Sequence, residues 1–161
     1  MTTSDPRHRI RPMSSGDLDE LVRIERESFD TPWDRDQFLA PVGGEGVAIH
    51  LVLETDDSGG PRRIAGYASA WVVAGEMQIN NFAMAKECRR QGLGTRMLHH
   101  LLDEAARQGC AEVSLEVSRA NQGAIRMYEA CGFRKVGIRK AYYRNSGEDA
   151  LILTCLLGIV L

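Results

Sequence analysis

The chain has 161 residues, enough for one domain with a sizeable hydrophobic core. With 43% hydrophobic and 26% charged residues, its composition is that of an ordinary globular protein. The formal net charge of -2 and the sequence pI near 6.1 argue against nucleic-acid binding driven by the neutralisation of phosphates. We therefore expect no direct nucleic-acid partner, and any anion-binding site must be local.

The ends of the chain and its cysteines bear on the cellular compartment. The first residues, "MTTSDPRHRIRPMSSG", lack the apolar core of a signal peptide, and the final run "ALILTCLLGIVL" has only 12 residues, too few to span a bilayer. The four cysteines lie 21 to 24 residues apart, and together with the four histidines they show no metal-ligand spacing. We expect a cytoplasmic protein with reduced cysteines, no bound metal and no membrane partner.

The first half of the chain is predicted to contain strands and two helices, without a repeat or a linker that would separate domains. Ser14 is a helix cap, with Asp17 completing a capping-box pattern, and a shorter helix is predicted at 34–40. The segments with strand-like composition are 8–13, 47–54, 64–73 and 76–84. Short turns between the last three are compatible with an antiparallel meander.

In the second half, the hydrophobic period changes to that of a helix at Leu93, and Gly109 ends this run. Asn121 caps a further helix, which Gly132 ends. The remaining strands are predicted at 111–117, 133–142 and 148–156. The elements together predict a mixed α/β sheet in a single domain that covers residues 1–161, with a β-α-β unit in the middle where a ligand is expected.

The stretch "RRQGLGTRML" places two glycines directly before that apolar helical run. Glycine lets a backbone approach an anion closely, and the unpaired N–H groups at a helix start stabilise negative charge. A P-loop would need Lys followed by Ser or Thr where Thr95 and Arg96 stand, and a dinucleotide fingerprint would need a third glycine in place of Met97. The remaining pattern, R-x-x-G-x-G at a strand-to-helix junction, predicts a site for another anion. The alternative is a helix start with two incidental glycines.

The pattern formed by Arg89, Gly92 and Gly94 resembles the signature with which the GNAT superfamily of N-acetyltransferases holds the pyrophosphate of acetyl-coenzyme A. Three further blocks, "FDTPW", "LEVSRANQGAIRMYEACGF" and "RKAYYRNSGEDALIL", are similar to the bacterial ribosomal-protein-alanine N-acetyltransferases of the Rim group. These blocks span most of the chain in the family's order. The resemblance implies one N-acetyltransferase domain of mixed α+β class, whose central, mostly antiparallel twisted sheet is flanked by helices.

The resemblance also implies that acetyl-coenzyme A is the co-substrate and that no metal takes part. The pantetheine arm would lie beside the strand that ends at Met84, pairing with its backbone as an added strand would, and the glycine turn would hold the pyrophosphate. The residues expected to contact the cofactor are Phe82, Ala83, Met84, Arg89, Arg90, Gln91, Gly92, Leu93, Gly94, Thr95 and Asn121. For Asn121, a cofactor contact and a helix cap are compatible roles.

Acetyl transfer to an amine needs a base for the nitrogen and an acid for the departing thiolate. The resemblance assigns these roles to Glu116, at the end of a predicted strand, and to Tyr128, in the following helix. A tyrosine with the usual pKa of about 10 is protonated at neutral pH and can donate to a thiolate. Direct transfer in a ternary complex is implied, without an acyl-enzyme. The plainer alternatives are a solvated glutamate and a core tyrosine.

Aromatic residues in two of the blocks bear on the acceptor. Trp33 in "FDTPW", together with Tyr142 and Tyr143 in "YYRNSGED", is expected to form walls over the amine channel, which favours a peptide. The leading hypothesis is acetylation of a protein N-terminus, the alanine of a small-subunit ribosomal protein, by a monomer or weak dimer. Two alternatives stay open: an acetyltransferase for a small amine or a protein lysine, and a non-catalytic acyl-coenzyme A binding module.

Overall fold

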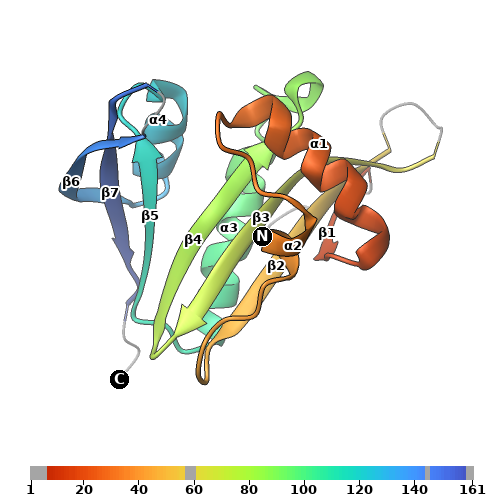
Figure 1. The fold of residues 1–161 in the computed structure, drawn as a ribbon. Helices are drawn as coiled ribbons and strands as arrows, with labels where there is room; N and C mark the ends of the chain where they lie inside the picture. The colour runs from red at the N-terminus through yellow and green to blue at the C-terminus, as the bar shows by residue number, and fades with distance from the viewer. Residues whose placement is uncertain (1–6, 57–60, 144–145, 159–161) are drawn as a thin grey trace.

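The computed structural model describes residues 7–56, 61–143 and 146–158. Seven strands form one sheet in the order β1-β2-β3-β4-β5-β7-β6, with β4 and β5 parallel and the other neighbours antiparallel (Figure 1). The strands are β1 (His8–Pro12), β2 (Val47–Thr55), β3 (Arg63–Val73), β4 (Glu76–Met84), β5 (Glu112–Ser118), β6 (Arg134–Tyr143) and β7 (Glu148–Leu156). The predicted mixed, mostly antiparallel sheet is confirmed, and the predicted strand bounds differ from these by one residue or so.

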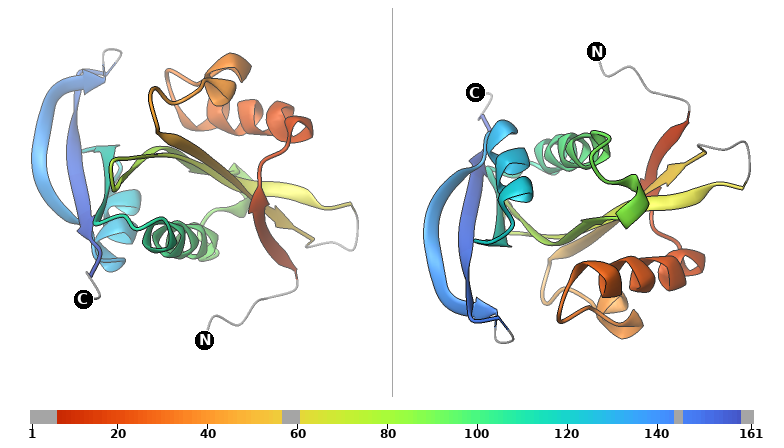
Figure 2. Two further views of the ribbon diagram at one scale, coloured as in Figure 1. Left: turned by 90° about the horizontal axis from the view of Figure 1, so that it is seen from below. Right: turned by 90° about the horizontal axis from the view of Figure 1, so that it is seen from above.

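Helices cover both faces of the sheet. The helix pair α1 and α2 lies on one face, and α3 and α4 lie on the other (Figure 2). The helical segments are η1 (Ser15–Asp17), α1 (Leu18–Ser28), α2 (Arg35–Leu39), η2 (Lys86–Cys88), α3 (Leu93–Arg107) and α4 (Gln122–Ala130), where η marks a 3-10 helix. None of the helices in the described ranges is both long and apolar enough to cross a membrane.

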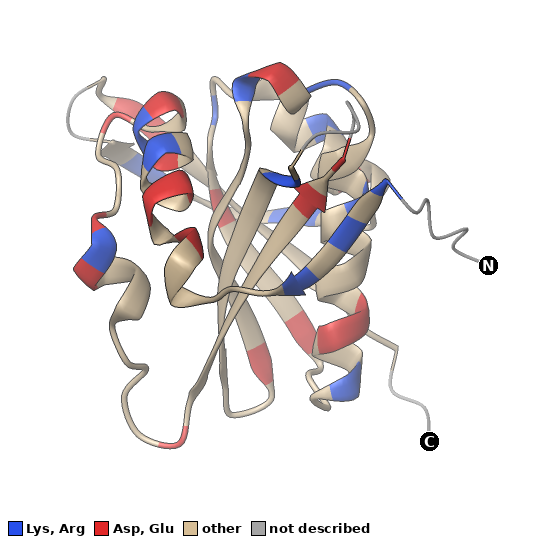
Figure 3. Cartoon of the chain, turned by 90° about the vertical axis from the view of Figure 1, so that its right-hand side faces the viewer, with Lys and Arg blue, Asp and Glu red and all other residues tan. Residues whose placement is uncertain are grey.

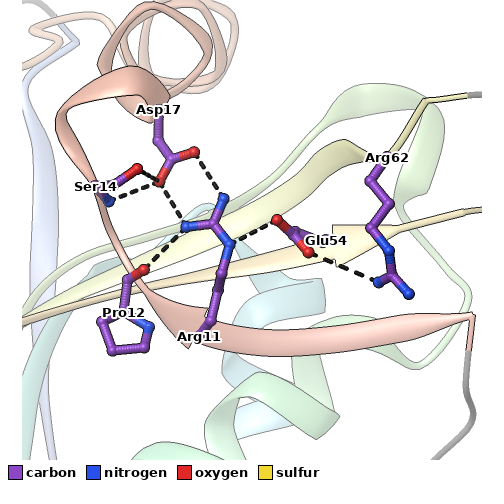
Figure 4. A network of polar contacts seen from close by, with 6 residues as sticks. All are labelled: Arg11, Pro12, Ser14, Asp17, Glu54 and Arg62. Carbon is purple, nitrogen blue, oxygen red and sulfur yellow. Dashed lines mark hydrogen bonds and ion pairs between the residues drawn. The ribbon is translucent and has the colours of Figure 1, made fainter.

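A polar network ties β1 to the start of α1 (Figure 4). Arg11 donates to Asp17 at 2.8 Å and to Glu54 of β2 at 2.6 Å, and Arg62 lies 3.7 Å from the same glutamate. The guanidinium holds the pKa of Asp17 below its usual value. The backbone N–H of Ser14 also donates to Asp17 at 2.7 Å, so the predicted pairing of these two residues is confirmed; it opens a 3-10 turn before α1.

The outer surface of α1 carries interleaved acidic and basic residues (Figure 3). Arg23 donates to Glu20 at 2.9 Å and to Glu27 at 2.8 Å, pairs at helical spacing. The inner surface buries Leu21, Ile24 and other apolar side chains against the sheet. This amphipathic pattern fixes which face of α1 meets the strands.

The two parallel strands separate part-way along their length. They pair from Glu76 opposite Glu112 to Ile79 opposite Leu115, whereas β4 continues to Met84 and β5 to Ser118 (Figure 1). A bulge accompanies the separation, because Ile79 and Asn81 oppose consecutive residues of β3 and Asn80 is the extra residue. Bulges bend a strand and re-aim its side chains. The split between β4 and β5 is therefore built into the sheet.

The C-terminal strands are arranged in an order that the sequence did not predict. The chain runs from β5 through α4 to the edge strand β6 and then returns as β7 between them. Most side chains of β6 are exposed, which agrees with an edge position. Residues 57–60, in the connection between β2 and β3, and residues 159–161, the last three of the final run "ALILTCLLGIVL", lie outside the described residues.

Candidate active site

The glycine turn leads directly into α3, as predicted. Gly92 has φ 77°, a left-handed conformation that favours glycine, and a Cβ placed on it would meet nothing within 4 Å. Helix α3 begins at Leu93 without an acidic residue in its first turn, while Arg90 and Thr95 are exposed beside it. The first N–H groups of a helix lack partners within the helix. The turn thus offers an open, electropositive cradle of the kind that binds phosphates.

The second glycine serves a different purpose from the first. A Cβ on Gly94 would lie 3.1 Å from the sulfur of Met127 and 3.8 Å from side-chain atoms of Met84 and Phe82. This position therefore needs a small residue because α3, β4 and α4 pack closely around it. Gly92 is required by backbone conformation, and Gly94 by packing at the point where the predicted site residues meet.

Two polar side chains stabilise the turn itself. Arg89 donates to the carbonyl oxygen of Met84 and to the hydroxyl of Ser28, both at 3.1 Å. Gln91 donates to the carbonyl oxygen of Glu87 at 3.2 Å. These bonds attach the turn to the end of β4 and to the end of α1, so both side chains have a structural role in addition to the cofactor contact predicted for them.

Tyr128 lies in α4 with 6% of its surface exposed. Its ring makes edge contacts with Phe82, at 6.0 Å between ring centroids, and with Phe133, at 5.6 Å. Burial, with a smaller contribution from Tyr143, raises the pKa of Tyr128. The phenol therefore stays protonated at neutral and moderately alkaline pH and is available as a proton donor. Its contact with Phe82 places it beside the strand expected to bind the cofactor.

Glu116 lies at the open end of β5 with a side chain that is 17% exposed. Arg139 of β6 approaches it, with Nε 3.1 Å from Oε1, and the same guanidinium lies 5.7 Å above the ring of Tyr142. The pKa of Tyr142 is raised mainly by burial and also by the nearby carboxylate of Glu116. The pKa of Tyr143 is likewise raised, first by burial and then by Tyr142 and Glu116. Tyr143 also contributes to the raised pKa of Tyr128, so Tyr143 interacts electrostatically with both the predicted base and the predicted acid.

A bulge in β6 brings these side chains to Glu116. The pairing with β7 shifts between Arg139 and Tyr143, and Ala141 within this interval has φ 50°. The backbone N–H of Ala141 donates to Asp149 at 2.9 Å, which holds the irregular strand against β7. Arg139 and Asp149 were not predicted as site residues. The sequence signal for the bulge is weak, because neither glycine nor proline marks it.

Trp33 packs within the segment between α1 and α2. Its ring meets Phe38 edge-on at 5.4 Å, and Phe38 meets Tyr67 in the same way at 5.4 Å. The backbone N–H of Trp33 donates at 2.8 Å to Glu25, a fully buried carboxylate that also accepts from Tyr67 and Asn81. Glu25 was not predicted as a site residue, although its spacing from Leu21 and Val22 places it on the apolar face of α1, which is a signal of burial.

The remaining predicted residues have clear local roles. Asn121 caps α4 by accepting from the backbone N–H of Ala124 at 3.2 Å, so the predicted cap is confirmed. Ala83 is buried in β4.

A surface hollow of about 650 Å³ lies away from these residues, between the charged faces of α1 and α2. In the ranges the structure describes, no three His, Cys, Asp or Glu side chains are grouped to hold a metal ion.

Known proteins resemble this chain in sequence and in fold. The sequence model of the Acetyltransferase (GNAT) family matches residues 18–133. The ribosomal protein bS18-alanine N-acetyltransferase of Salmonella typhimurium is 35% identical over 147 residues, covering 89% of this chain and 94% of the relative. Its Escherichia coli K12 counterpart is 33% identical over 146 residues, with the same shares covered.

Solved structures agree with the sequence matches. The crystal structure of the ribosomal-protein-S18-alanine N-acetyltransferase from Escherichia coli matches with a TM-score of 0.82 and 31% identity, covering 96% of each chain. Ard1 from Thermoplasma volcanium, at 23% identity and a TM-score of 0.80, shares the fold and covers 95% of this chain. With the family match over most of its length, the chain belongs to the GNAT family of acetyltransferases.

Proposed function

We propose that this acetyltransferase moves the acetyl group of acetyl-coenzyme A to the N-terminal α-amine of a protein, the alanine of a small-subunit ribosomal protein. The observation that carries the proposal is the meeting of Gly94, Phe82, Met84 and Tyr128 at the split between β4 and β5. The choice of acceptor is supported by relatives that are about a third identical over 89% of the chain and are named for the alanine of bS18.

The residues around the split fit acetyl-coenzyme A. Open space above Gly92 and the N-terminus of α3 suit the pyrophosphate. Beyond Ile79, the backbone of β4 has left its pairing with β5, so its N–H and C=O groups are suited to pair with an extended pantetheine arm. The bound cofactor supplies an activated thioester. Phe82, Ala83 and Met84 would line it, and Asn121 would contact it from the start of α4.

Two side chains move the protons. Glu116 accepts a proton from the attacking amine as the new bond between nitrogen and the acetyl carbon forms and the carbon–sulfur bond breaks. Tyr128 donates its proton to the departing sulfur, and the products are an amide and free coenzyme A. Burial suits Tyr128 to this role, because it keeps the phenol neutral until a thiolate develops beside it.

The chemistry of Glu116 favours an α-amine over a lysine. A free α-amino group has a pKa of about 8, against about 10.4 for lysine, so at pH 7.5 roughly a quarter of the former is neutral and about 0.1% of the latter. A single carboxylate is a sufficient base for the first amine and a poor one for the second.

The test pairs an alanine-initiated peptide with an N-terminally blocked twin that contains lysine, over about pH 6.5 to 9. We expect acetylation of the first peptide and little of the second. Equal rates on the blocked peptide would show a lysine acetyltransferase instead. Binding of acetyl-coenzyme A by calorimetry without turnover of either peptide, or of a panel of small amines, would indicate a non-catalytic module.

A further inference from the structure

A carboxylate with no part in the proposed proton transfer lies buried between α1 and the strands β3 and β4. Glu25 of α1 has none of its surface exposed. One of its oxygens accepts from the hydroxyl of Tyr67 in β3 and from the side-chain amide of Asn81 in β4. The other oxygen accepts from the backbone N–H of Trp33 at 2.8 Å. The segment after α1, the strand β3 and the strand β4 therefore meet on one side chain.

The donors explain why this position holds a carboxylate. A buried charge is costly unless hydrogen bonds satisfy it, and here each of the two oxygens accepts from a donor. Burial and the neighbouring charge of Glu25 raise the pKa of Tyr67, so the phenol remains a donor. A glutamine would present one oxygen and an amide group that itself donates. If its oxygen kept the bond to Trp33, Tyr67 and Asn81 would have to turn acceptors toward its amide, so the three present hydrogen bonds could not all be retained.

Glu25 and three aromatic residues form a closed ring of contacts around the segment that follows α1. Glu25 accepts from the backbone of Trp33, the ring of Trp33 contacts Phe38, Phe38 contacts Tyr67, and the hydroxyl of Tyr67 donates to Glu25. The hydrogen bond from Asn81 links this ring of contacts to β4 directly before Phe82. Glu25 therefore contacts both the segment at Trp33 and the part of β4 next to Phe82.

We propose that Glu25 is a positioning residue for the acceptor peptide: it fixes residues 29–34, with Trp33, against β4, so that this segment forms one wall of the amine channel. The proposal rests on the proposed N-terminal acetyltransferase activity. It assigns Glu25 no part in proton transfer and no contact with the cofactor. The cofactor turn is instead attached to β4 and α1 through Arg89, which bonds Met84 and Ser28.

The decisive variant is Glu25→Gln, which preserves size and removes one acceptor. We expect the KM for an alanine-initiated peptide to rise about 10-fold or more, the scale of one lost hydrogen bond to a charged group. The KM for acetyl-coenzyme A, and the slow rate at which acetyl-coenzyme A is hydrolysed in the absence of peptide, should each change less than about two-fold. Glu27→Gln is the matched control, because Glu27 is a partly exposed carboxylate on the same helix that pairs with Arg23, and it should leave all three quantities unchanged.

Hydrogen exchange gives a readout that does not depend on turnover. In Glu25→Gln the amide of Trp33 should exchange faster than in the unmodified protein, while amides in the centre of β3 keep their rates. Tyr67→Phe removes one donor and leaves two, so it should shift the peptide KM in the same direction by a smaller factor. This milder variant tests the proposal if Glu25→Gln does not fold.

Three results would overturn the proposal. One is an unchanged peptide KM in both variants, and another is an equal rise in the KM values for peptide and cofactor, which would indicate general destabilisation. The third is unchanged exchange at Trp33. If the unmodified protein acetylates no alanine-initiated peptide, the proposed function fails, and slow exchange at Trp33 that depends on Glu25 would still establish the anchor itself.

Discussion

The two sides of the split between β4 and β5 are built in different ways. On the side proposed to bind the cofactor, a short run of consecutive residues forms the turn, and a positive φ at Gly92 and close packing at Gly94 determine its shape. On the side proposed to receive the acceptor, Glu25 meets Asn81, and Glu116 meets Arg139, through contacts between distant segments. Backbone geometry thus determines the shape of the turn, which Arg89 attaches to Ser28, whereas side-chain pairs between distant segments form the other side. Substitutions on the two sides should therefore have separable effects.

The largest effect is expected where the two sides meet, at Tyr128. Tyr128→Phe keeps the ring contacts with Phe82 and Phe133 and removes the proton donor. We expect kcat to fall on the order of 10²-fold or more, with little change in the KM for acetyl-coenzyme A. Steady-state kinetics and calorimetry measure the two quantities. A near-normal kcat would make Tyr128 a core residue and nothing more.

The pH dependence of Tyr128 follows from its environment. Because burial raises its pKa, the unmodified protein should keep its proton donor through alkaline pH, and kcat should not decline up to about pH 9.5. Loss of activity between about pH 8 and 9, without loss of folded protein in circular dichroism, would contradict this.

On the acceptor side, Glu116→Gln should lower the rate most at low pH, on the order of 10²-fold. Recovery should be partial as rising pH deprotonates the amine without help from the protein. The control is Glu112→Gln, at the start of the same strand, which should leave the pH profile unchanged. A uniform loss at every pH would mean that Glu116 has a structural role.

On the cofactor side, two glycines at opposite ends of α3 form a matched pair. Gly92 and Gly109 have φ of 77° and 76°, and a Cβ on either would meet nothing within 4 Å. Alanine at either position should therefore cost about 1 kcal/mol of folding free energy. Only Gly92→Ala should weaken acetyl-coenzyme A binding, by about 10-fold, the scale of one disturbed charge-assisted contact. Equal affinities in the two variants would remove the turn from the cofactor site.

The smallest effect is expected at Arg139, whose side chain is 57% exposed. Arg139→Met should lower kcat/KM for the peptide about three-fold, because exposed ion pairs contribute little and are screened by salt. Arg139→Lys should retain part of the activity, and Lys140→Met, a neighbouring charge on β6, should have no effect. Added salt should reduce the difference between Arg139→Met and the unmodified protein.

The sequence was informative where structure depends on neighbouring residues. The meander, the capping of α4 by Asn121 and the start of α3 at Leu93 were predicted because hydrophobic period, caps and glycines act locally. The family signature likewise identified the turn, and the resemblance is confirmed by the family match.

What the sequence did not predict depends on three-dimensional packing. The insertion of β7 between β5 and β6 leaves no mark in hydrophobic alternation. The spacing of Glu25 from Leu21 and Val22 places it on the apolar face of α1, but the helical pattern does not identify its partners Tyr67 and Asn81 on two other elements. Arg139 reaches Glu116 across a bulge that neither glycine nor proline announces.

The most direct test of the central claim, that the split joins acetyl-coenzyme A to a protein N-terminus, is mass spectrometry of purified small-subunit ribosomal proteins. The proteins would be incubated with acetyl-coenzyme A and either the unmodified enzyme or Tyr128→Phe. We predict one added acetyl group on the N-terminal residue of an alanine-initiated protein, with the unmodified enzyme only. Acetyl groups on internal lysines, or none on any N-terminus in a preparation that binds acetyl-coenzyme A, would contradict the claim.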